Sequence, residues 1–257
     1  EGTAGITRWE ETEPRDTKWF AYFQNQMSRE VAAACEGALA AGATDILVKD
    51  AHDTGRNIDP SMLPRSVCIN RAWSGNPFTM VAGLSEDFDA LAFTGYHSGG
   101  GSDGNPLSHT SNTKLDCITI NGQRASEFMV YSYCAGLMGV PVAFLSGDAA
   151  LCEDARQFIP GITAVAVSKG SGNASTSSHP DDAVEMIREG MKQALKGDCS
   201  RCMVKMPKKF DVRVRYGDHP TAYSMSFYPG ARQLDEKTIA FEHTDYNEVM
   251  RFFHFVI

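Results

Sequence analysis

Basic residues are in short supply in this chain of 257 residues, which has 24 lysines and arginines against 32 aspartates and glutamates. The net charge is therefore −8 at pH 7. Nucleic acids and anionic membranes both attract proteins through a positively charged surface. We therefore expect neither of them as the main partner of this protein.

Long apolar runs are also missing. No stretch of about 18 consecutive apolar residues occurs, so the sequence predicts no transmembrane helix. Residues 1–10 lack the basic end and the apolar stretch of a secretory signal peptide, and none is expected there. Apolar residues still make up 42% of the chain, which is enough to build a sizeable core.

The cysteine pattern argues against a disulfide framework. The seven cysteines are odd in number and lie mostly in apolar segments, which indicates reduced thiols in a cytoplasmic protein. Cys199 and Cys202 form a Cys-x-x-Cys pair, but a zinc ribbon needs a second pair, which the sequence lacks. We interpret this pair as a coincidence near a helix end.

Helical periodicity and short apolar runs alternate along the chain. Helices are predicted at 17–41, 126–138, 149–158 and 181–196. Strands are predicted at 45–49, 90–95, 115–122, 141–148, 162–167, 210–216 and 237–242. This alternation predicts an α/β fold with a mostly parallel central sheet flanked by helices.

Two features divide the chain further. The stretch 168–180 is rich in glycine, serine and threonine and predicts a loop that resembles a linker. The alternation of predicted strands and helices changes after Pro207. We therefore predict a main metal-binding α/β domain at 1–204 and a smaller α+β subdomain at 205–257.

Three histidines follow predicted strands. His52 comes after the strand at 45–49, His97 after the strand at 90–95, and His109 lies further along the same loop. Functional sites of parallel sheets lie beyond the carboxyl ends of the strands, so we expect these side chains to converge. A single histidine at a strand end is more often structural, and that reading stays open for each one. The intervening residues 98–106 are so rich in glycine that we expect a reason other than packing.

Carboxylates would complete a zinc site built on histidines. The candidates are Glu1, Asp50, Asp53, Asp103, Glu127 and Asp148. Glu127 opens a predicted helix, where it would also stabilise the helix dipole without any metal. Asp50 and Asp53 flank His52 and are expected to accept a hydrogen bond from its second ring nitrogen. For Asp50, a turn residue at the strand end is an equally good explanation.

Several short motifs then occur in a recognisable order. They are EGTAGIT (1–7), VKDAHD (48–53), GYHSG (95–99), PLSHT (106–110), INGQRASEF (120–128), PVAFLSGD (141–148) and AYSMSFYPG (222–230). Taken together, they resemble the zinc-dependent D-aminopeptidase family over essentially the whole chain. Each motif is short, and the resemblance depends on their order and spacing.

The resemblance implies a site with two zinc ions. Glu1 and His97 would bind one ion, His52 and Glu127 the second, and His109 would be the catalytic histidine. The family pattern also has an aspartate two residues before its first glutamate, on a central strand, that bridges both ions. The corresponding position precedes Glu1, and we expect such a strand in the complete protein.

The implied function is that of a metallo-aminopeptidase. It would remove the N-terminal residue of short peptides, particularly D-alanine-like residues, through water activated by two zinc ions. The resemblance further implies a ring-like homo-oligomer, such as a decamer. Two alternatives stay open, namely another dinuclear hydrolase (a phosphoesterase or an amidohydrolase) and an inactive homologue that binds peptides or serves in assembly.

Overall fold

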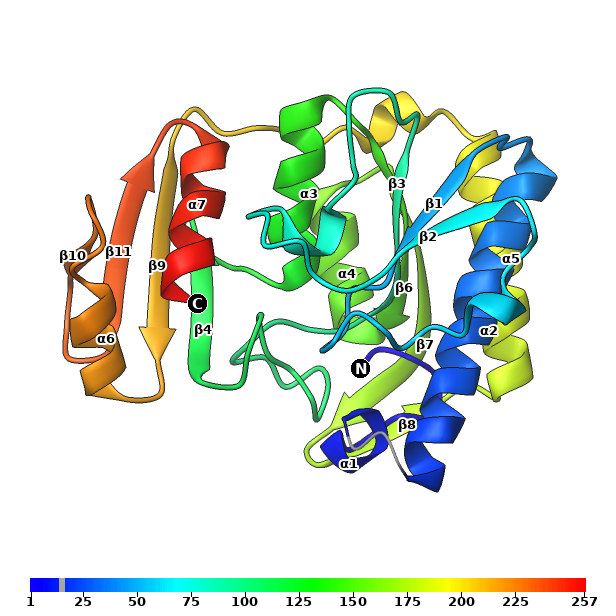
Figure 1. Ribbon diagram of the computed structural model, residues 1–257, viewed down its shortest axis with the longest axis horizontal. Helices are drawn as coiled ribbons and strands as arrows, with labels where there is room; N and C mark the ends of the chain where they lie inside the picture. The colour runs from blue at the N-terminus through cyan, green and yellow to red at the C-terminus, as the bar shows by residue number, and fades with distance from the viewer. Residues whose placement is uncertain (14–16) are drawn as a thin grey trace.

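A four-stranded sheet lies in the middle of the protein. The computed structural model describes residues 1–13 and 17–257 (Figure 1). The strands of this sheet, in spatial order, are β3 (Leu91–Tyr96), β6 (Val142–Asp148), β7 (Thr163–Ser171) and β8 (Ala174–Ser177). The first three are parallel and β8 is antiparallel to β7. All residues of β6 are buried, as expected for a strand covered on both faces.

Helices cover both faces of this sheet. They are α2 (Lys18–Ala41), α3 (Glu127–Met138), α4 (Ala149–Phe158) and α5 (Pro180–Lys196). Phe144 on β6 packs in one apolar cluster with residues of α2 and α5. Its neighbour Leu145 packs in another cluster, with α3 and α4, because successive side chains of a strand point to opposite faces.

A second, antiparallel sheet lies beside the first. Its strands, in spatial order, are β10 (Arg232–Gln233), β11 (Thr238–His243), β9 (Phe210–Tyr216), β4 (Leu115–Ile120) and β5 (Gln123–Arg124). The helices of this region are α6 (His219–Met225) and α7 (Tyr246–Val256). Strand β9, which belongs to 205–257, therefore pairs with β4, which lies earlier in the chain.

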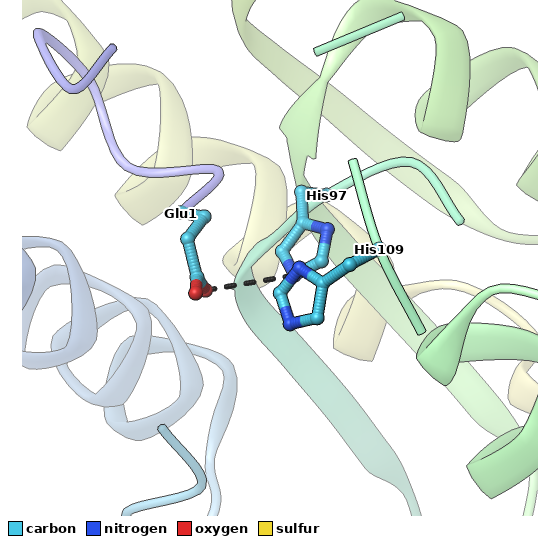
Figure 2. Close-up of side chains that lie close together, drawn as sticks. All are labelled: Glu1, His97 and His109. Carbon is cyan, nitrogen blue, oxygen red and sulfur yellow. Dashed lines mark ion pairs between the residues drawn. The ribbon is translucent and has the colours of Figure 1, made fainter. Parts of the chain in front are cut away.

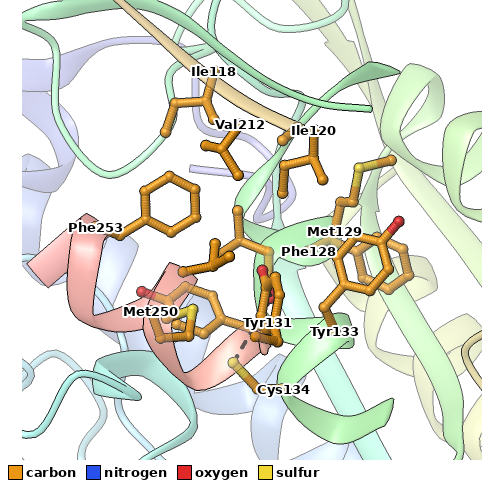
Figure 3. Packing of buried hydrophobic residues seen from close by; sticks show 14 of the residues in the cluster. Ile118, Ile120, Phe128, Met129, Tyr131, Tyr133, Cys134, Val212, Met250 and Phe253 are labelled. Atoms are coloured by element: carbon orange, nitrogen blue, oxygen red, sulfur yellow. Dashed lines mark hydrogen bonds between the residues drawn. The ribbon is translucent and has the colours of Figure 1, made fainter. Parts of the chain in front are cut away.

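Helix α3 lies between the two sheets. Figure 3 shows its side chains Phe128, Tyr131 and Tyr133 packed beside Val212 of the second sheet and Phe253 of α7. The first nine residues of α3 are all buried, from Glu127 onward. A helix enclosed in this way holds its first residue in a fixed position relative to both sheets.

A third, two-stranded parallel sheet joins β1 (Ile46–Lys49) to β2 (Val67–Asn70). A cavity of about 940 Å³ lies between β1, β3 and α2. Among the described residues, β1 pairs only with β2 and β3 only with β6, so each strand has a free edge at this cavity. We call this cavity the strand slot. Glu1 lies at one end of it, where the Gly2 amide donates to the carbonyl of Gly95 at 3.0 Å.

The structure confirms the expected α/β architecture and the predicted helices and strands. The loop predicted at 168–180 is wrong, because β7 continues to Ser171 and forms a hairpin with β8. Ser177 accepts a hydrogen bond from the Gly5 amide at 2.8 Å, and Ser175 donates to the carbonyl of Ile6 at 3.2 Å. The polar side chains of this hairpin thus hold the N-terminal segment.

The remaining elements are short. They are α1 (Trp9–Thr12) and the 3-10 helices η1 (Pro60–Met62), η2 (Thr79–Val81) and η3 (Cys199–Cys202). None of the helices in the described part of the chain is long and apolar enough to cross a bilayer.

Glu30 on α2 anchors the N-terminal segment from the other side. Its side chain is buried, and its Oε1 accepts hydrogen bonds from the Ala4 amide at 2.9 Å and from Gln26 at 3.0 Å. Its Oε2 has no hydrogen-bond partner within residues 1–13 and 17–257. Burial raises the pKa of Glu30 from 4.5 to about 7, because water is excluded from the charged form.

This raised pKa predicts a pH-dependent stability. Folded protein binds more protons at Glu30 than unfolded protein between about pH 4.5 and 7. The free energy of unfolding of the wild type, relative to that of the Glu30→Gln variant, should therefore be greatest below pH 4.5. This advantage should be lost as the pH rises through about 7. The change in the pKa of Glu30 corresponds to a change of about 3 kcal/mol in the free energy of unfolding.

Urea unfolding of both metal-free proteins at pH 5 and pH 8 measures this difference. Glu36→Gln, at an exposed position of the same helix, serves as the control. A stability difference between wild type and Glu30→Gln that stays constant across this pH range would contradict the assignment.

Candidate metal centre

Two carboxylates and three imidazoles meet beside the carboxyl ends of β1 and β3. The Oε2 atom of Glu1 lies 3.2 Å from His52 Nδ1 and 3.5 Å from His97 Nε2. Glu127 lies 3.7 Å from both His97 Nε2 and His109 Nε2. The structure therefore brings together all five residues that the sequence predicted as metal ligands or reacting group. Figure 2 shows Glu1, His97 and His109 facing one another.

His97 presents one defined nitrogen to the carboxylates. Its Nδ1 lies 3.0 Å from the Ser98 carbonyl, which only accepts hydrogen bonds, so Nδ1 carries the proton. Its Nε2 then has a free lone pair that faces Glu1 and Glu127. This is the arrangement that metal-binding histidines commonly adopt.

His109 is oriented in the same way. Its Nδ1 lies 2.9 Å from the Leu107 carbonyl, which leaves the Nε2 lone pair toward Glu127. The imidazole stacks on His97 with 4.5 Å between ring centroids, and the edge of Trp9 packs against it at 5.2 Å. These contacts hold the ring at a fixed angle beside the carboxylates.

His52 uses its other nitrogen. Nδ1 faces Glu1, whereas Nε2 lies 3.3 Å from the carbonyl of Thr12 at the end of α1. The Phe23 ring packs edge-on at 5.4 Å between centroids. Helix α1 thus contacts two of the three histidines, through the Trp9 ring and the Thr12 carbonyl, and neither contact was foreseen from the sequence. A backbone carbonyl carries no sequence signal.

The two histidines nearest Glu1 differ in their electrostatics. Burial lowers the pKa of His97 below its usual value, despite the attraction of Glu1 and Glu127. Burial also acts to lower the pKa of His52, but the adjacent Glu1 carboxylate outweighs it and raises that pKa. A lowered pKa favours neutral imidazole, which is the form that binds a metal.

Glu127 is placed by the start of α3. Ser126 caps the helix through its hydroxyl, which accepts from the Met129 amide, and Glu127 follows as a buried residue. Its Oε1 also accepts from the Ser111 amide at 2.8 Å. A carboxylate that only complemented the helix dipole would not need to be buried between two histidines.

Asp50 and Asp53 lie in the turn that carries His52. The Asp50 carboxylate is buried and accepts hydrogen bonds from the backbone amides of Asn57 and Ile58. The Asn57 side chain in turn donates to the carbonyl of His52. Asp50 thereby fixes the backbone on both sides of this turn. Asp53 has a positive φ of 43°, and its carbonyl accepts from the Trp73 indole at 2.6 Å.

Packing explains two of the glycines of residues 98–106, contrary to the expectation from sequence, whereas Gly101 has a positive φ of 77° that favours glycine. A Cβ atom on Gly104 would lie 2.4 Å from the Cβ of Ala150 and 2.5 Å from the Ser98 hydroxyl. A Cβ atom on Gly99 would lie 2.9 Å from the Ala125 carbonyl. Close approach of this segment to its neighbours therefore requires glycine.

The donor set fits zinc. Zinc in proteins is bound by imidazole nitrogens and carboxylate oxygens, and here Glu1, His97 and His109 offer atoms that all lie within 4.8 Å of one another. The three side chains are at most partly exposed. His109 thus lies within reach of a metal ion, although the resemblance gave it a catalytic role.

A cavity of about 480 Å³, which we call the site pocket, is lined by Glu1, His52, His109 and Glu127. Its walls include the carboxylates Glu1, Glu13, Asp53 and Glu127, the indoles Trp9 and Trp73, and residues of α7. No lysine or arginine lines it in the described part of the chain. The pocket is therefore suited to a cationic group rather than an anionic one.

Known proteins resemble this chain along its whole length. A family model described as D-aminopeptidase matches residues 1–255. A D-aminopeptidase from Bacillus subtilis (strain 168) is 27% identical over 224 residues, which cover 85% of this chain and 80% of that protein. The solved structure of the zinc-dependent D-aminopeptidase DppA from Bacillus subtilis, a self-compartmentalizing protease, superposes with a TM-score of 0.90 at 23% identity. That match covers 100% of this chain and 93% of the other.

The Glu127→Ala substitution should lower zinc affinity, because it removes one of the two buried carboxylates of the centre. Zinc titration by calorimetry and metal analysis after dialysis measure the effect, which should be about 10-fold or more in the dissociation constant. Glu248→Ala removes a first-turn acid of α7 and is the matched control for the helix-dipole explanation. Equal zinc binding by both variants would exclude Glu127 as a ligand.

Proposed function

We propose that this chain, which belongs to the D-aminopeptidase family, is a zinc-dependent aminopeptidase that removes a small N-terminal D-residue from short peptides. The observation that carries the proposal is the meeting of five side chains through ion pairs, namely Glu1, His52, His97, His109 and Glu127. All of them except His97 line the site pocket. A bound metal explains why five potential metal-binding side chains from separate segments meet there.

Two zinc ions per chain are part of this proposal. Glu1 and His97 would hold one ion, and His52 and Glu127 the second. Bound zinc supplies Lewis acidity, which polarises a carbonyl and makes water acidic enough to provide a nucleophile at neutral pH. The protein supplies fixed ligand orientations through the carbonyls of Ser98 and Thr12.

His109 is the reacting group of the proposed mechanism. Because its Nδ1 proton is held by the Leu107 carbonyl, its Nε2 can take up or deliver a proton beside the carboxylates. In its protonated form, the same nitrogen can donate a hydrogen bond to the negatively charged oxygen of a tetrahedral intermediate. Stacking on His97 keeps this nitrogen directed into the site.

A second role for His109 has one observation in its favour. Its ligand atom lies within 4.8 Å of those of Glu1 and His97, so these three side chains could hold one ion together. His109 would then be a third zinc ligand. The two roles differ in what the His109→Ala substitution does to zinc content.

The strand slot supports a further ligand. We propose that an extended segment leading into Glu1 fills the slot and pairs with the free edges of β1 and β3. A carboxylate two residues before Glu1, as the family pattern has it, would complete the dinuclear centre. Metal analysis of a chain that carries this segment tests the proposal, since it should bind two zinc ions.

The lining of the site pocket supports a peptide with a free amino end as substrate. Glu13 and Asp53, the two wall carboxylates not assigned to zinc, can attract an ammonium group, and the described walls offer no lysine or arginine to help the zinc ions hold a phosphate. This favours the aminopeptidase over a phosphoesterase. Trp9 and Trp73 offer apolar surface for the small side chain of the substrate.

Assembly into a homo-oligomer belongs to the same proposal, and a ring such as a decamer is the form that the family resemblance implies. Large aromatic side chains are exposed near α6 and α7, with Tyr223 59%, Phe227 70% and Phe255 62% exposed. Apolar side chains exposed to this degree suit contact with a second copy. Light scattering tests this against the 28.0 kDa of one chain. All seven cysteines are free, which supports a reducing, cytoplasmic compartment.

The substrate class is tested with zinc-loaded protein and small amides. D-alanine amide should be hydrolysed faster than L-alanine amide, and at least about 100-fold faster than a phosphate monoester, a difference of about 3 kcal/mol in barrier. Faster release of phosphate than of ammonia would overturn the proposed reaction.

The His109→Ala variant separates the two roles of this residue. As an acid or base it should leave zinc content unchanged and lower turnover of D-alanine amide by at least about 100-fold. His219→Ala, at an exposed position of α6, is the control. Loss of zinc together with activity would make His109 a ligand, and retained activity would remove it from the mechanism.

A further inference from the structure

Asp148 at the carboxyl end of β6 is fully buried, yet it lies outside the metal-binding set. Both of its oxygens are engaged. Oδ2 accepts from the Ser98 amide at 2.6 Å and from Asn105 Nδ2 at 3.4 Å. Oδ1 accepts from the Ser98 hydroxyl at 2.6 Å and from the Leu151 amide at 2.8 Å. One carboxylate thus connects β6 and the start of α4 to both ends of the segment 98–105.

The bonds to Ser98 act on His97. Ser98 follows His97 directly, and its carbonyl accepts the Nδ1 proton of that histidine at 3.0 Å. By holding the amide and the hydroxyl of Ser98, Asp148 fixes the residue whose carbonyl orients the imidazole. His97 Nε2 is thereby directed at Glu1 and Glu127.

The hydrogen bond from Asn105 to Asp148 links Asp148 to Glu1 and His109, which lie beside His97 in Figure 2. The Asn105 side chain also donates to the Glu1 carbonyl at 3.3 Å. Its Oδ1 accepts from the Leu107 amide at 2.9 Å, and the Leu107 carbonyl holds His109. Asn105 is itself buried, so water does not compete for these bonds.

We propose that Asp148 is a positioning residue that sets the relative geometry of Glu1, His97 and His109 through Ser98 and Asn105. It touches no ligand atom of the centre and acts only through these two residues. The proposal rests on the proposed function only in taking Glu1 and His97 to bind zinc, with His109 beside them. Groups that support metal ligands in this way commonly change metal affinity by 10- to 100-fold.

Asp148 also caps α4, and this role must be separated from the positioning role. The Asp148→Asn variant does so, because asparagine caps helices as well as aspartate does. Its remaining oxygen can still accept from Leu151. Its side-chain NH2 group, however, would face the Ser98 N–H and the Asn105 NH2 group. All three groups are hydrogen-bond donors, so the two hydrogen bonds that Asp148 Oδ2 accepts would be lost.

The experiment measures zinc affinity by calorimetry and the visible spectrum of the Co²⁺-loaded protein. We expect the zinc dissociation constant of Asp148→Asn to rise by about 10- to 100-fold, with an altered Co²⁺ spectrum. Asn105→Ala, which leaves the α4 cap intact, should weaken zinc binding by about 10-fold. Asp245→Asn, at the N-cap of α7, is the matched control and should leave both measurements unchanged.

Wild-type zinc affinity and an unchanged Co²⁺ spectrum in Asp148→Asn would overturn the positioning role. If Asp148→Asn does not fold, Asn105→Ala decides by the same criteria. Zinc binding by the wild type without hydrolysis of D-alanine amide would overturn the proposed function alone, since the affinity measurements do not depend on the substrate.

Discussion

Burial of two carboxylates next to each other is the constraint on which this site depends. Glu1 and Glu127 are both largely removed from water, and the ion pairs they make within the described residues are with histidines. Buried negative charge is costly unless cations or hydrogen-bond donors compensate it. A neutral imidazole does not balance the negative charge of these carboxylates, and it does so only once a proton has taken up its nitrogen lone pair. Metal ions balance the charge of both carboxylates and at the same time bind the lone pairs of the neutral imidazoles. The charge balance of the site therefore favours a metal-loaded state.

The fold meets this constraint by bringing distant segments to one edge. His52 and His97 follow the strands β1 and β3 on either side of the strand slot, and Glu1 lies at the end of that slot. Glu127 starts a helix enclosed between two sheets. Glu30, Ser175 and Ser177 hold the N-terminal segment from two sides. Ordering these groups in the fold spares metal binding the entropic cost of assembling them.

Much of this could be predicted from sequence, because the signals are local. Helical periodicity and apolar runs depend on the segment alone, and they gave α2 and β6 almost to the residue. The convergence of His52 and His97 was expected from the geometry of a parallel sheet, and it occurs although β1 and β3 belong to two separate sheets. Glu127 could be assigned only through the family resemblance, since a first-turn acid of a helix looks the same in sequence whether or not it binds a metal.

The β7–β8 hairpin could not be predicted, because a Ser- and Thr-rich strand is stabilised by its tertiary partners. Ser175 and Ser177 bind the backbone of residues 5 and 6, far away in sequence. The hydrogen bonds that orient the three histidines could not be predicted either, because they also depend on the tertiary structure. Ser98, Leu107 and Thr12 act through carbonyls, which every residue possesses.

The glycines around His97 show how composition can mislead about dynamics. A glycine-rich stretch beside a site is easily read as a mobile lid. Gly99 and Gly104 instead lie where any side chain would collide with neighbouring atoms. The same segment carries Ser98 and Asn105, whose bonds to Asp148 require a fixed backbone. Glycine here permits close packing, and close packing gives the adjacent histidines the fixed geometry that a metal centre needs.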